Sequence, residues 1–591
     1  MLIFLYFCTQ FIVMQKENAI ILLLFVFIFL CNITAKADDE IFSYESDHYI
    51  INVEALHPDS EMTLMDVLLV CPDFITTDGR NIVGKYELCV DNVAHHMDVE
   101  TFFQNVKASE LKEVHVYNFG SVSQGSNGLY GVVDVFYKTP TSPGTSGKVA
   151  VEGSTYGNGK LYADVTTSSK NVEIKGYALT SLKYGKASTD DIDYFRSRRA
   201  VENAHFSLKW DISPKDNLMI KAYQQFYDYK ERSHIIEDDE NSTFPILERY
   251  GDFVAKYTRI LNDNGAEFCT EACGDYLNLH EGELKVRDTY PYLYAEFSSP
   301  LFTEDLQIMV GWEIDYDNYW VIDYNRQQYL ENQFYMQLNY THGPWNITIG
   351  DRFNHFNHWS HSFNPGDEEF RTSNSKNINC FQASVGYKVN RHLIQGSFSH
   401  DFYLPTADEI YLDISALEKR KFYPKTNTIW NTEAMYTYQH KNIMSSSSVY
   451  YSWMDDSYLP KEQKVGFRTS LTWRAGILRL TAGADYYHIN TELGGLDTNI
   501  RNNCINLKLA PTLLLGHGFR ISSVLLYNNK QSLSLIPSHL YASVKVNKDF
   551  GKHLNVYADF RDIAGMPSFP ILNLQENYYN RALTMGMTYR F

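Results

Sequence analysis

The stretch LTMGMTYRF, Leu583–Phe591, alternates large apolar residues with threonine, glycine and arginine at every step. A period of two residues predicts a β-strand with one apolar face and one polar face. The strand ends on a bulky aromatic side chain, although the last residues of a soluble domain are usually poorly held. We therefore expect the aromatic end of this strand to serve as a recognition element.

The same alternation recurs over most of the sequence after residue 145. Clear segments begin at Val172, Phe334, Leu478, Leu540 and Leu554. We count roughly twenty of them, each about the 9–11 residues that cross a bilayer at a tilt. Because backbone groups in lipid must all be paired, an exported chain of such strands has to close on itself. Residues 145–591 are predicted to form a mainly β fold, a transmembrane antiparallel β-barrel.

The composition agrees with strands that face lipid. The chain has 44 Tyr, 35 Phe and 8 Trp, an aromatic share of 15 %, yet its mean hydropathy is -0.33. Alternation halves the density of apolar residues, and aromatic girdles mark the two bilayer interfaces, so a barrel explains both values. The net charge of -19 argues against nucleic acid and against an anionic surface as partner.

The N-terminal region has the layout of a secretory signal peptide. Lys16 precedes the apolar run Ala19–Leu30, and the small residues Ala35 and Ala37 follow it. The run is too short to span a membrane. We predict a signal peptide over residues 1–37, cut before Asp38, with Met14 as the true start.

The segment between the signal peptide and the barrel lacks bilayer alternation and carries a resemblance. Its successive stretches are similar to the plug domain of TonB-dependent receptors, in the same order: Thr63–Phe74, Asp78–Lys85, Leu88–Asn92, Lys107–Val116 and Gly128–Thr139. Two further stretches resemble barrel motifs of that family, Phe402–Leu412 and Tyr423–Tyr436. The resemblance implies a small α+β plug over residues 62–144, inside the lumen of a barrel of about 22 strands.

The resemblance also implies a location and an activity. The aromatic C-terminus resembles the signature that the outer-membrane assembly machinery reads in bacterial barrels, and the compact plug looks most like that of the Bacteroidota branch. The chain would be a monomeric outer-membrane receptor, without cofactor or enzyme activity, that imports a small-molecule ligand. A surface-binding protein that does not transport and a passive pore with a degenerate plug remain alternatives. Ferric siderophore, haem, cobalamin, peptide and oligosaccharide all remain possible cargoes.

Import in that family is driven by the TonB complex on the periplasmic side, which pairs with an extended N-terminal segment. Here residues 38–61 are short and contain no clear TonB motif. The candidate contact residues lie in EIFSY: Glu40, Ile41, Phe42, Ser43 and Tyr44. The next extended stretch, Tyr49–Val53, is assigned to the first strand of the plug instead.

The ligand-binding candidates fall in two places. Glu231–Glu281 is the longest predicted outward connection, with a partly helical pattern over Ile246–Leu261, and it contains Tyr250 and His280. Long connections of barrels face outward and carry function, but a solvated lid without specificity is the alternative. On the plug, Asn92 ends a strand that faces the ligand side in the family, and His95 and His96 follow it. The two histidines either ligate haem or a metal or form a hydrated surface pair.

Cysteine spacing gives the last predictions. In an exported protein, Cys269 and Cys273 form a C-x-x-x-C that we interpret first as a local disulfide and second as a metal clip. Cys71 and Cys89 lie in the same small plug and are a second candidate pair. Cys380 and Cys504 fall in strands, where buried thiols are expected. No metal site is assigned.

Overall fold

The computed structural model describes residues 41–44, 48–56, 62–70, 86–91, 94–95, 102–103, 106–117, 131–138, 143–155, 157–187, 192–235, 240–282, 284–322, 325–362, 370–404, 426–440, 442–455, 461–493, 498–529, 539–561, 563 and 582–591. The predicted signal peptide lies outside these residues. Among the described residues, no helix has both the length and the apolar character needed to cross a membrane.

The N-terminal part of the chain forms a six-stranded sheet. Its order is β1-β2-β5-β6-β3-β4, and only the β3–β6 pair is parallel. The strands are β1 (Phe42–Tyr44), β2 (Tyr49–Asn52), β3 (Tyr86–Val90), β4 (Ala94–His95), β5 (Leu111–Tyr117) and β6 (Gly131–Tyr137). The stretch Tyr49–Val53 therefore supplies a plug strand, as predicted. The sheet starts at Phe42, ahead of the predicted plug start at residue 62.

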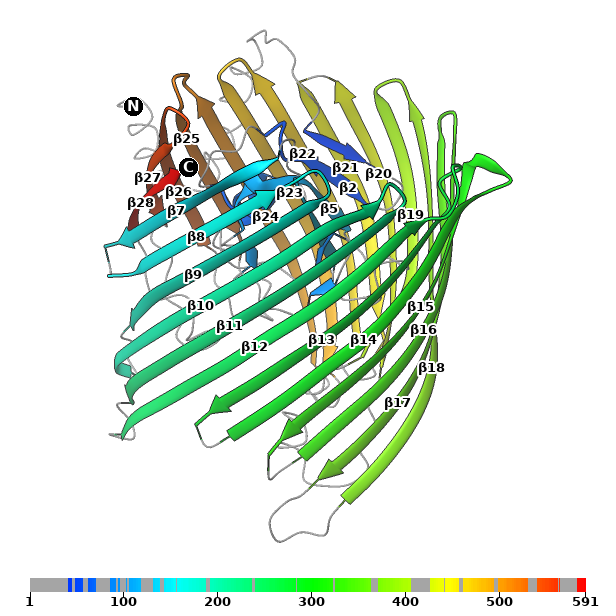
Figure 1. Cartoon of the computed structure of the whole chain (residues 1–591), viewed down its shortest axis with the longest axis horizontal. Helices are drawn as coiled ribbons and strands as arrows, with labels where there is room; N and C mark the ends of the chain where they lie inside the picture. Colours follow the sequence, from blue (N-terminus) through cyan, green and yellow to red (C-terminus); the bar gives the residue numbers. More distant parts are fainter. Residues whose placement is uncertain are drawn as a thin grey trace.

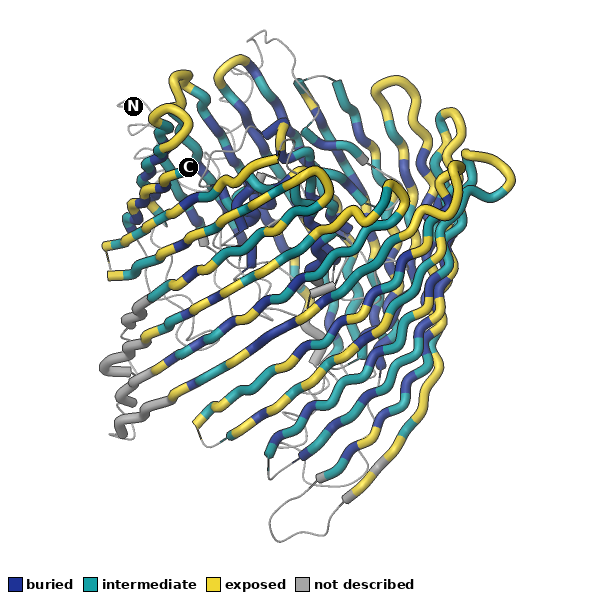
Figure 2. The backbone as a smooth tube through the Cα atoms, in the orientation of Figure 1, coloured by how far each residue is buried: buried dark blue, intermediate teal, exposed yellow. Residues whose placement is uncertain are grey.

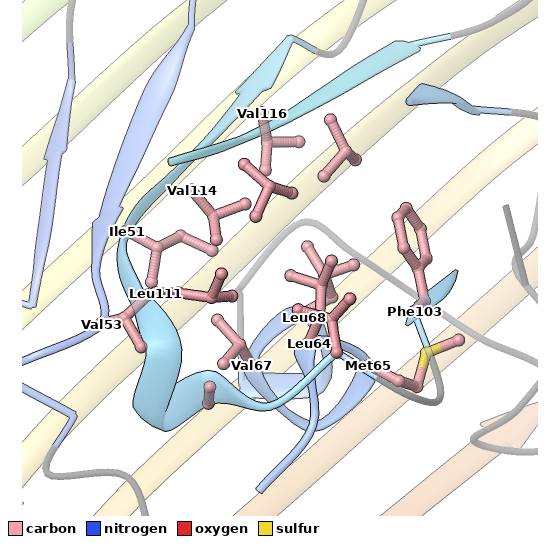
Figure 3. Close-up of a cluster of buried hydrophobic side chains, with 14 of the residues drawn as sticks. Ile51, Val53, Leu64, Met65, Val67, Leu68, Phe103, Leu111, Val114 and Val116 are labelled. Carbon is pink, nitrogen blue, oxygen red and sulfur yellow. The ribbon is translucent and has the colours of Figure 1, made fainter. Parts of the chain in front are cut away.

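One face of this sheet is covered by the helix α3 (Leu64–Val70). The helix begins at a reciprocal cap, in which the Asp66 amide donates to the Thr63 hydroxyl (3.2 Å) and the Thr63 amide donates to the Asp66 carboxylate (2.9 Å). Its apolar residues pack against the inward residues of β2 and β5 in a fully buried core, with Phe103 at one side (Figure 3). The short helix η1 (Ala108–Glu110) leads directly into β5.

The rest of the chain is a closed antiparallel barrel of 22 strands, β7 to β28 in sequence order, as predicted (Figure 1). The strands are β7 (Gly144–Ser154), β8 (Gly159–Ser168), β9 (Val172–Ala187), β10 (Ile192–Ser213), β11 (Asp216–Ile235), β12 (Glu240–Ile260), β13 (Glu267–Glu281), β14 (Leu284–Leu301), β15 (Thr303–Val321), β16 (Asn325–His342), β17 (Trp345–Ser362), β18 (Phe370–Val389), β19 (His392–Tyr403), β20 (Asn427–His440), β21 (Ile443–Met454), β22 (Lys461–Ala475), β23 (Leu478–Leu493), β24 (Thr498–Leu514), β25 (Phe519–Asn528), β26 (His539–Phe550), β27 (Leu554–Arg561) and β28 (Ala582–Arg590).

The two faces of the barrel differ as the alternation predicts. On β28, Met585, Met587 and Tyr589 are about half exposed on the outside, whereas Thr584 and Thr588 are buried toward the lumen. The same alternation of buried and exposed positions runs along most barrel strands (Figure 2). A closed, even-numbered barrel with an apolar exterior is the architecture of bacterial outer-membrane proteins. The chain is accordingly a multi-pass barrel of the outer membrane.

The barrel closes between β28 and β7. Phe591 exchanges two backbone hydrogen bonds with Gly147, at 3.0 and 3.2 Å. The Phe591 ring occupies the space beside the Gly147 Cα, where a Cβ atom would approach the ring within 2.6 Å. Glycine is therefore required at position 147, and the aromatic end of the chain is held by the first barrel strand.

Strand length varies around the barrel. β10 has 22 residues and β11 has 20, whereas β27 has 8 and β28 has 9. The long strands β10 to β18 run well past the level of the small sheet, while the short ones end near it (Figure 1). One wall of the described barrel is thus much taller than the other.

Candidate functional site

The two rims of the barrel have different connections. At the rim that holds Phe591, connections are short, such as residues 214–215 and 343–344. At the opposite rim they include residues 404–426 and 562–581. Outer-membrane barrels have short periplasmic turns and longer extracellular loops. The rim with the chain end is therefore the periplasmic side.

The small sheet fills the lumen near the periplasmic rim. Barrel residues of β7, β9, β11, β12, β20, β23 and β26 contact it, and most lie within a few residues of a short turn: Lys148, Lys175, Lys221, Lys256, Gln439, Arg479 and Lys545. Tyr223, Tyr250, Met444, Leu526 and Tyr541 of the barrel join the buried apolar core of the sheet. This sheet is the plug.

A buried ionic cluster attaches the plug to the first barrel strands. Both Lys148 of β7 and Lys175 of β9 pair with the carboxylate of Glu110 at the end of η1. Tyr162 of β8 donates to the same carboxylate at 3.4 Å, and Lys148 also lies 3.3 Å from Asp164. Burial alone would raise the pKa of Glu110, but the two ammonium groups outweigh it and hold that pKa well below its ordinary value of 4.5. Glu110 is therefore a charged contact between plug and barrel.

A second ionic contact follows on β11 and β12. Lys221 lies 3.0 Å from the Asp91 carboxylate and donates to the Val90 carbonyl at 3.1 Å, while Lys256 donates to the Asp91 carbonyl at 3.3 Å. Burial opposes the charge on Asp91, yet the neighbouring Lys221 lowers the pKa of that carboxyl below 3.8. The wall from β7 to β12 thus offers ammonium groups to plug carboxylates.

The opposite wall of the barrel holds the plug through backbone carbonyls. Gln439 of β20 donates to the Phe42 carbonyl at 2.7 Å, and Arg479 of β23 donates to the Leu56 carbonyl at 2.6 Å. Both contacts reach the N-terminal part of the plug. The acceptors on this side are backbone carbonyls, in contrast to the Glu110 carboxylate that two lysines share.

Beyond the plug, the lumen wall from β12 to β17 is acidic and rich in tyrosine. Its inward carboxylates include Asp252, Glu271, Asp275, Glu296, Glu313 and Asp315. Tyrosine hydroxyls donate to several of them: Tyr292 to Glu271, and Tyr335 to Glu296. Arg352 is fully buried and lies 3.4 Å from Glu313. This set of inward side chains therefore carries more carboxylates than cationic groups.

The predicted outward connection Glu231–Glu281 is wrong. Most of this stretch forms the barrel strands β12 and β13, which pair from Ile246↔Glu281 to Ile260↔Glu267. The partly helical pattern at Ile246–Leu261 is also strand. Tyr250 faces the lumen and is buried against the plug, with its hydroxyl 3.5 Å from Asp252. His280 lies on the outward face and is exposed, so the structure does not bring these two candidates together.

The plug candidates are only partly described. Glu40, Asn92 and His96 lie outside the described residues, and His95 is paired with Leu88 in β4. Of the proposed TonB contacts, Phe42, Ser43 and Tyr44 form β1, which pairs with β2, and Phe42 is 2 % exposed. This segment is therefore part of the folded sheet and does not extend from it.

The predicted disulfide between Cys269 and Cys273 is wrong, because neither thiol is bonded to another. Both lie on the lumen face of β13, and four residues along a strand span about 13 Å, far more than a disulfide reaches. Among the described residues, no group of three His, Cys, Asp or Glu side chains is placed to hold a metal. Cys71 lies outside the described residues, whereas Cys89, Cys380 and Cys504 are buried.

Sequence reasoning missed the residues that attach the plug. Lys148, Lys175 and Lys221 stand at inward positions near the periplasmic ends of three early strands. The available sequence signal was a lysine at an inward position in each of these strands. No local pattern in the strands identifies Glu110 or Asp91 as the residue that each lysine contacts. The contacts depend on how the plug sits in the barrel.

No family model matches the sequence, and no curated protein is found as a relative. Solved structures do match the fold. The siderophore receptor PiuA from Acinetobacter baumannii aligns with a TM-score of 0.70 at 10 % identity, covering 94 % of this chain and 99 % of its own. The FrpB iron transporter from Neisseria meningitidis gives 0.68 at 12 % identity, covering 94 % and 100 %. The alcaligin receptor FauA from Bordetella pertussis gives 0.66 at 10 %, covering 93 % and 95 %.

Proposed function

We propose that this chain is a TonB-dependent receptor that imports a scarce nutrient across the outer membrane. The observation that carries the proposal is the plug itself, a folded sheet that fills a 22-stranded barrel and is attached to its wall by ion pairs and single hydrogen bonds. These contacts are separate from the hydrogen-bonded ladder that closes the barrel, so the plug can be displaced without unfolding the barrel. The alignments with siderophore receptors and an iron transporter support import as the activity.

In this proposal the ligand binds between the extracellular connections and the plug. The acidic, tyrosine-bearing wall of β12 to β17 contributes hydrogen-bond acceptors there and disfavours an anionic cargo. TonB then pairs with the segment that includes Ile41–Tyr44 and pulls the plug aside. The assignment to the Bacteroidota branch and the role of Asn92, His95 and His96 in ligand contact are further parts of the proposal. They rest on the sequence resemblance.

One observation favours the alternative of a surface receptor that binds without transport. Phe42–Tyr44 is paired with β2, and the Phe42 carbonyl accepts a hydrogen bond from Gln439. A partner strand would have to compete with these contacts before it could pull. Transport therefore requires that the β1–β2 hairpin, residues Phe42–Asn52, can leave the sheet.

The test is uptake by nutrient-starved cells that carry the wild type or a deletion of Asp38–His48. We expect the deletion to abolish growth on the limiting nutrient while surface binding of that nutrient persists. A heat-modifiable band on gels checks that the barrel of the deletion variant is folded. Uptake that survives the deletion contradicts TonB-driven import through this segment. A large conductance of the wild type in planar bilayers would instead support a passive pore.

A further inference from the structure

We propose that the stacked imidazoles of His48 and His115 form a proton-sensitive latch, which holds the β1–β2 hairpin on the plug at neutral pH and releases it in acid. The proposal concerns the segment whose release the proposed function requires, and its biological meaning rests on that function. The latch itself is a property of the plug sheet and is argued from the contacts of the two rings.

The hairpin is held at one end of the sheet by a stack of four rings. His48, which directly precedes β2, stacks on His115 of β5 with ring centroids 4.9 Å apart and planes at 22°. The same ring stacks on Tyr117 at 4.4 Å. His115 in turn contacts Phe136 of β6 at 4.5 Å. The two imidazoles therefore join the hairpin to the centre of the sheet.

The hairpin lies at the edge of the plug sheet, although Phe42, Tyr49 and Ile51 also belong to the buried core of the plug. β1 and β2 occupy the first two places in the sheet order, and only β5 borders them. The register places Ile50 opposite His115, and His48 lies just beyond the first pair of the ladder, Tyr49↔Val116. Opening this ladder exposes both imidazoles to water, and closing it buries them again.

The surroundings of His115 contain groups of both signs. On its own strand, Glu113 lies 3.6 Å away and Lys112 is next to it; from β6, Asp134 stands directly opposite His115 in the register. Asp134 is fully buried and interacts electrostatically with Lys256 of the barrel. His48 faces the ring from the hairpin. Protonation of His115 would place a positive charge beside the imidazole of His48, whose ring centroid is 4.9 Å away.

The docked hairpin consequently favours neutral His115. Burial, reinforced by the imidazole of His48 and opposed by the carboxylate of Glu113, lowers the pKa of His115 from 6.5 to about 4. In the released hairpin the ring is hydrated and regains the ordinary value. Protons therefore bind the released state more tightly. Docking has its full strength above pH 6.5 and weakens by roughly five- to sevenfold per pH unit as the pH falls from 6.5 toward 4.

Hydrogen exchange of the purified full-length chain in detergent tests the latch. Labelling at pH values of about 7.5, 6.5, 5.5 and 4.5, with times scaled to the intrinsic exchange rates, gives the opening constant of the peptide that covers Phe42–Val53. In the wild type this constant should rise about twofold from pH 7.5 to 6.5, about fivefold from 6.5 to 5.5 and about sevenfold from 5.5 to 4.5. In His115→Phe, which keeps a ring in the stack, the rise should vanish. His553→Phe, a ring change at a barrel turn, should behave like the wild type.

Two results would overturn the proposal. One is an equal pH dependence of hairpin exchange in the wild type and in His115→Phe. The other is hairpin exchange that follows the barrel strand β23 at every pH, which would indicate opening of the whole molecule. If His115→Phe does not fold, His115→Gln removes the titrating imidazole instead, and an unchanged pH dependence in that variant also overturns the latch. The measurement needs no transport, so failed uptake would count against the proposed function alone.

Discussion

The two sides of the interface between plug and barrel are built differently. From β7 to β12, buried lysines reach plug carboxylates, and Glu110 alone receives two of them. From β20 to β23, single donors reach backbone carbonyls of the N-terminal plug residues. A buried charge that loses its partner costs far more than a lost neutral hydrogen bond. The C-terminal part of the plug is therefore anchored, while the N-terminal part can be detached.

The comparison gives a direction to plug movement. The polar contacts of residues 42–56 with the barrel go to backbone carbonyls, from Gln439 and the buried Arg479, and these residues come first in the chain. Glu110 and Asp91, which follow, are fastened by contacts that leave unpaired buried ammonium groups when broken. A pull from the N-terminus should detach the β20–β23 side first and pivot the plug about the β7–β12 side. The following changes test that order.

The largest effect is expected for Glu110→Ala. It leaves Lys148 and Lys175 buried without their shared carboxylate, at a cost of about 3–5 kcal/mol to plug docking. Planar-bilayer recordings should show frequent large openings, and cells should become sensitive to bulky antibiotics. The matched control Glu113→Ala removes a more exposed plug carboxylate and should remain closed. Wild-type conductance in Glu110→Ala would mean that the ionic cluster does not anchor the plug.

A smaller effect is expected for Lys221→Met, which preserves the length of the side chain. It removes the ion pair with Asp91 and the bond to the Val90 carbonyl, about 2 kcal/mol together, because Asp91 is partly exposed and can rehydrate. Hydrogen exchange of the Tyr86–Asp91 peptide should speed up, and exchange of Phe42–Asn52 should not. Equal acceleration of both peptides would contradict separate attachment of the two plug parts.

Gln439→Ala should have a smaller effect than Lys221→Met. The effect should fall on the β1–β2 hairpin instead of the Tyr86–Asp91 peptide. The lost bond to the Phe42 carbonyl costs about 1 kcal/mol, so exchange of the hairpin should rise roughly fivefold while Tyr86–Asp91 stays protected. Gln395→Ala, at an inward position of the neighbouring strand β19, is the comparison variant. Faster exchange at Tyr86–Asp91 would show that the two sides of the interface are coupled.

The smallest effect near neutral pH is the pH dependence of the ionic cluster around Glu110. The pKa of Glu110 is lowered in the docked plug, so its stabilisation is present above the ordinary carboxyl value of 4.5 and is lost as the pH falls below it. Conductance openings of the wild type should therefore increase only below about pH 4.5. Glu110→Gln should show no such step. A step at the same pH in Glu110→Gln would assign it to another carboxyl group.

Barrel strands were predictable from sequence because most of them have one lipid-facing side. The wrong prediction at Glu231–Glu281 arose because β12 is apolar on both faces over part of its length. Phe253 faces outward and is 51 % exposed, but its neighbour Val254 faces inward and is also apolar, because it packs on Cys273 and Tyr292. Where lumen-facing residues pack in a core of their own, both faces of a strand become apolar and the period of two disappears.

The candidate site was harder to predict, because its geometry is set by distant segments. Tyr250 was named as a loop residue that contacts ligand, and the structure shows it on a strand against the plug. Lys148 and Glu110 are 38 residues apart and meet only when the plug is inside the barrel. Spacing along the chain cannot give such contacts, although the inward position of each lysine follows from the strand period.

The unequal height of the barrel wall has a consequence for how molecules arrive. A 22-residue strand at a tilt near 45° rises about 50 Å, whereas an 8-residue strand rises only about 20 Å, against a hydrocarbon thickness of about 30 Å. Strands β10 to β18 therefore extend beyond the lipid headgroups on one side of the barrel, whereas β25 to β28 do not. Among the described residues, this high side is the one that presents strand side chains above the membrane surface to an arriving molecule.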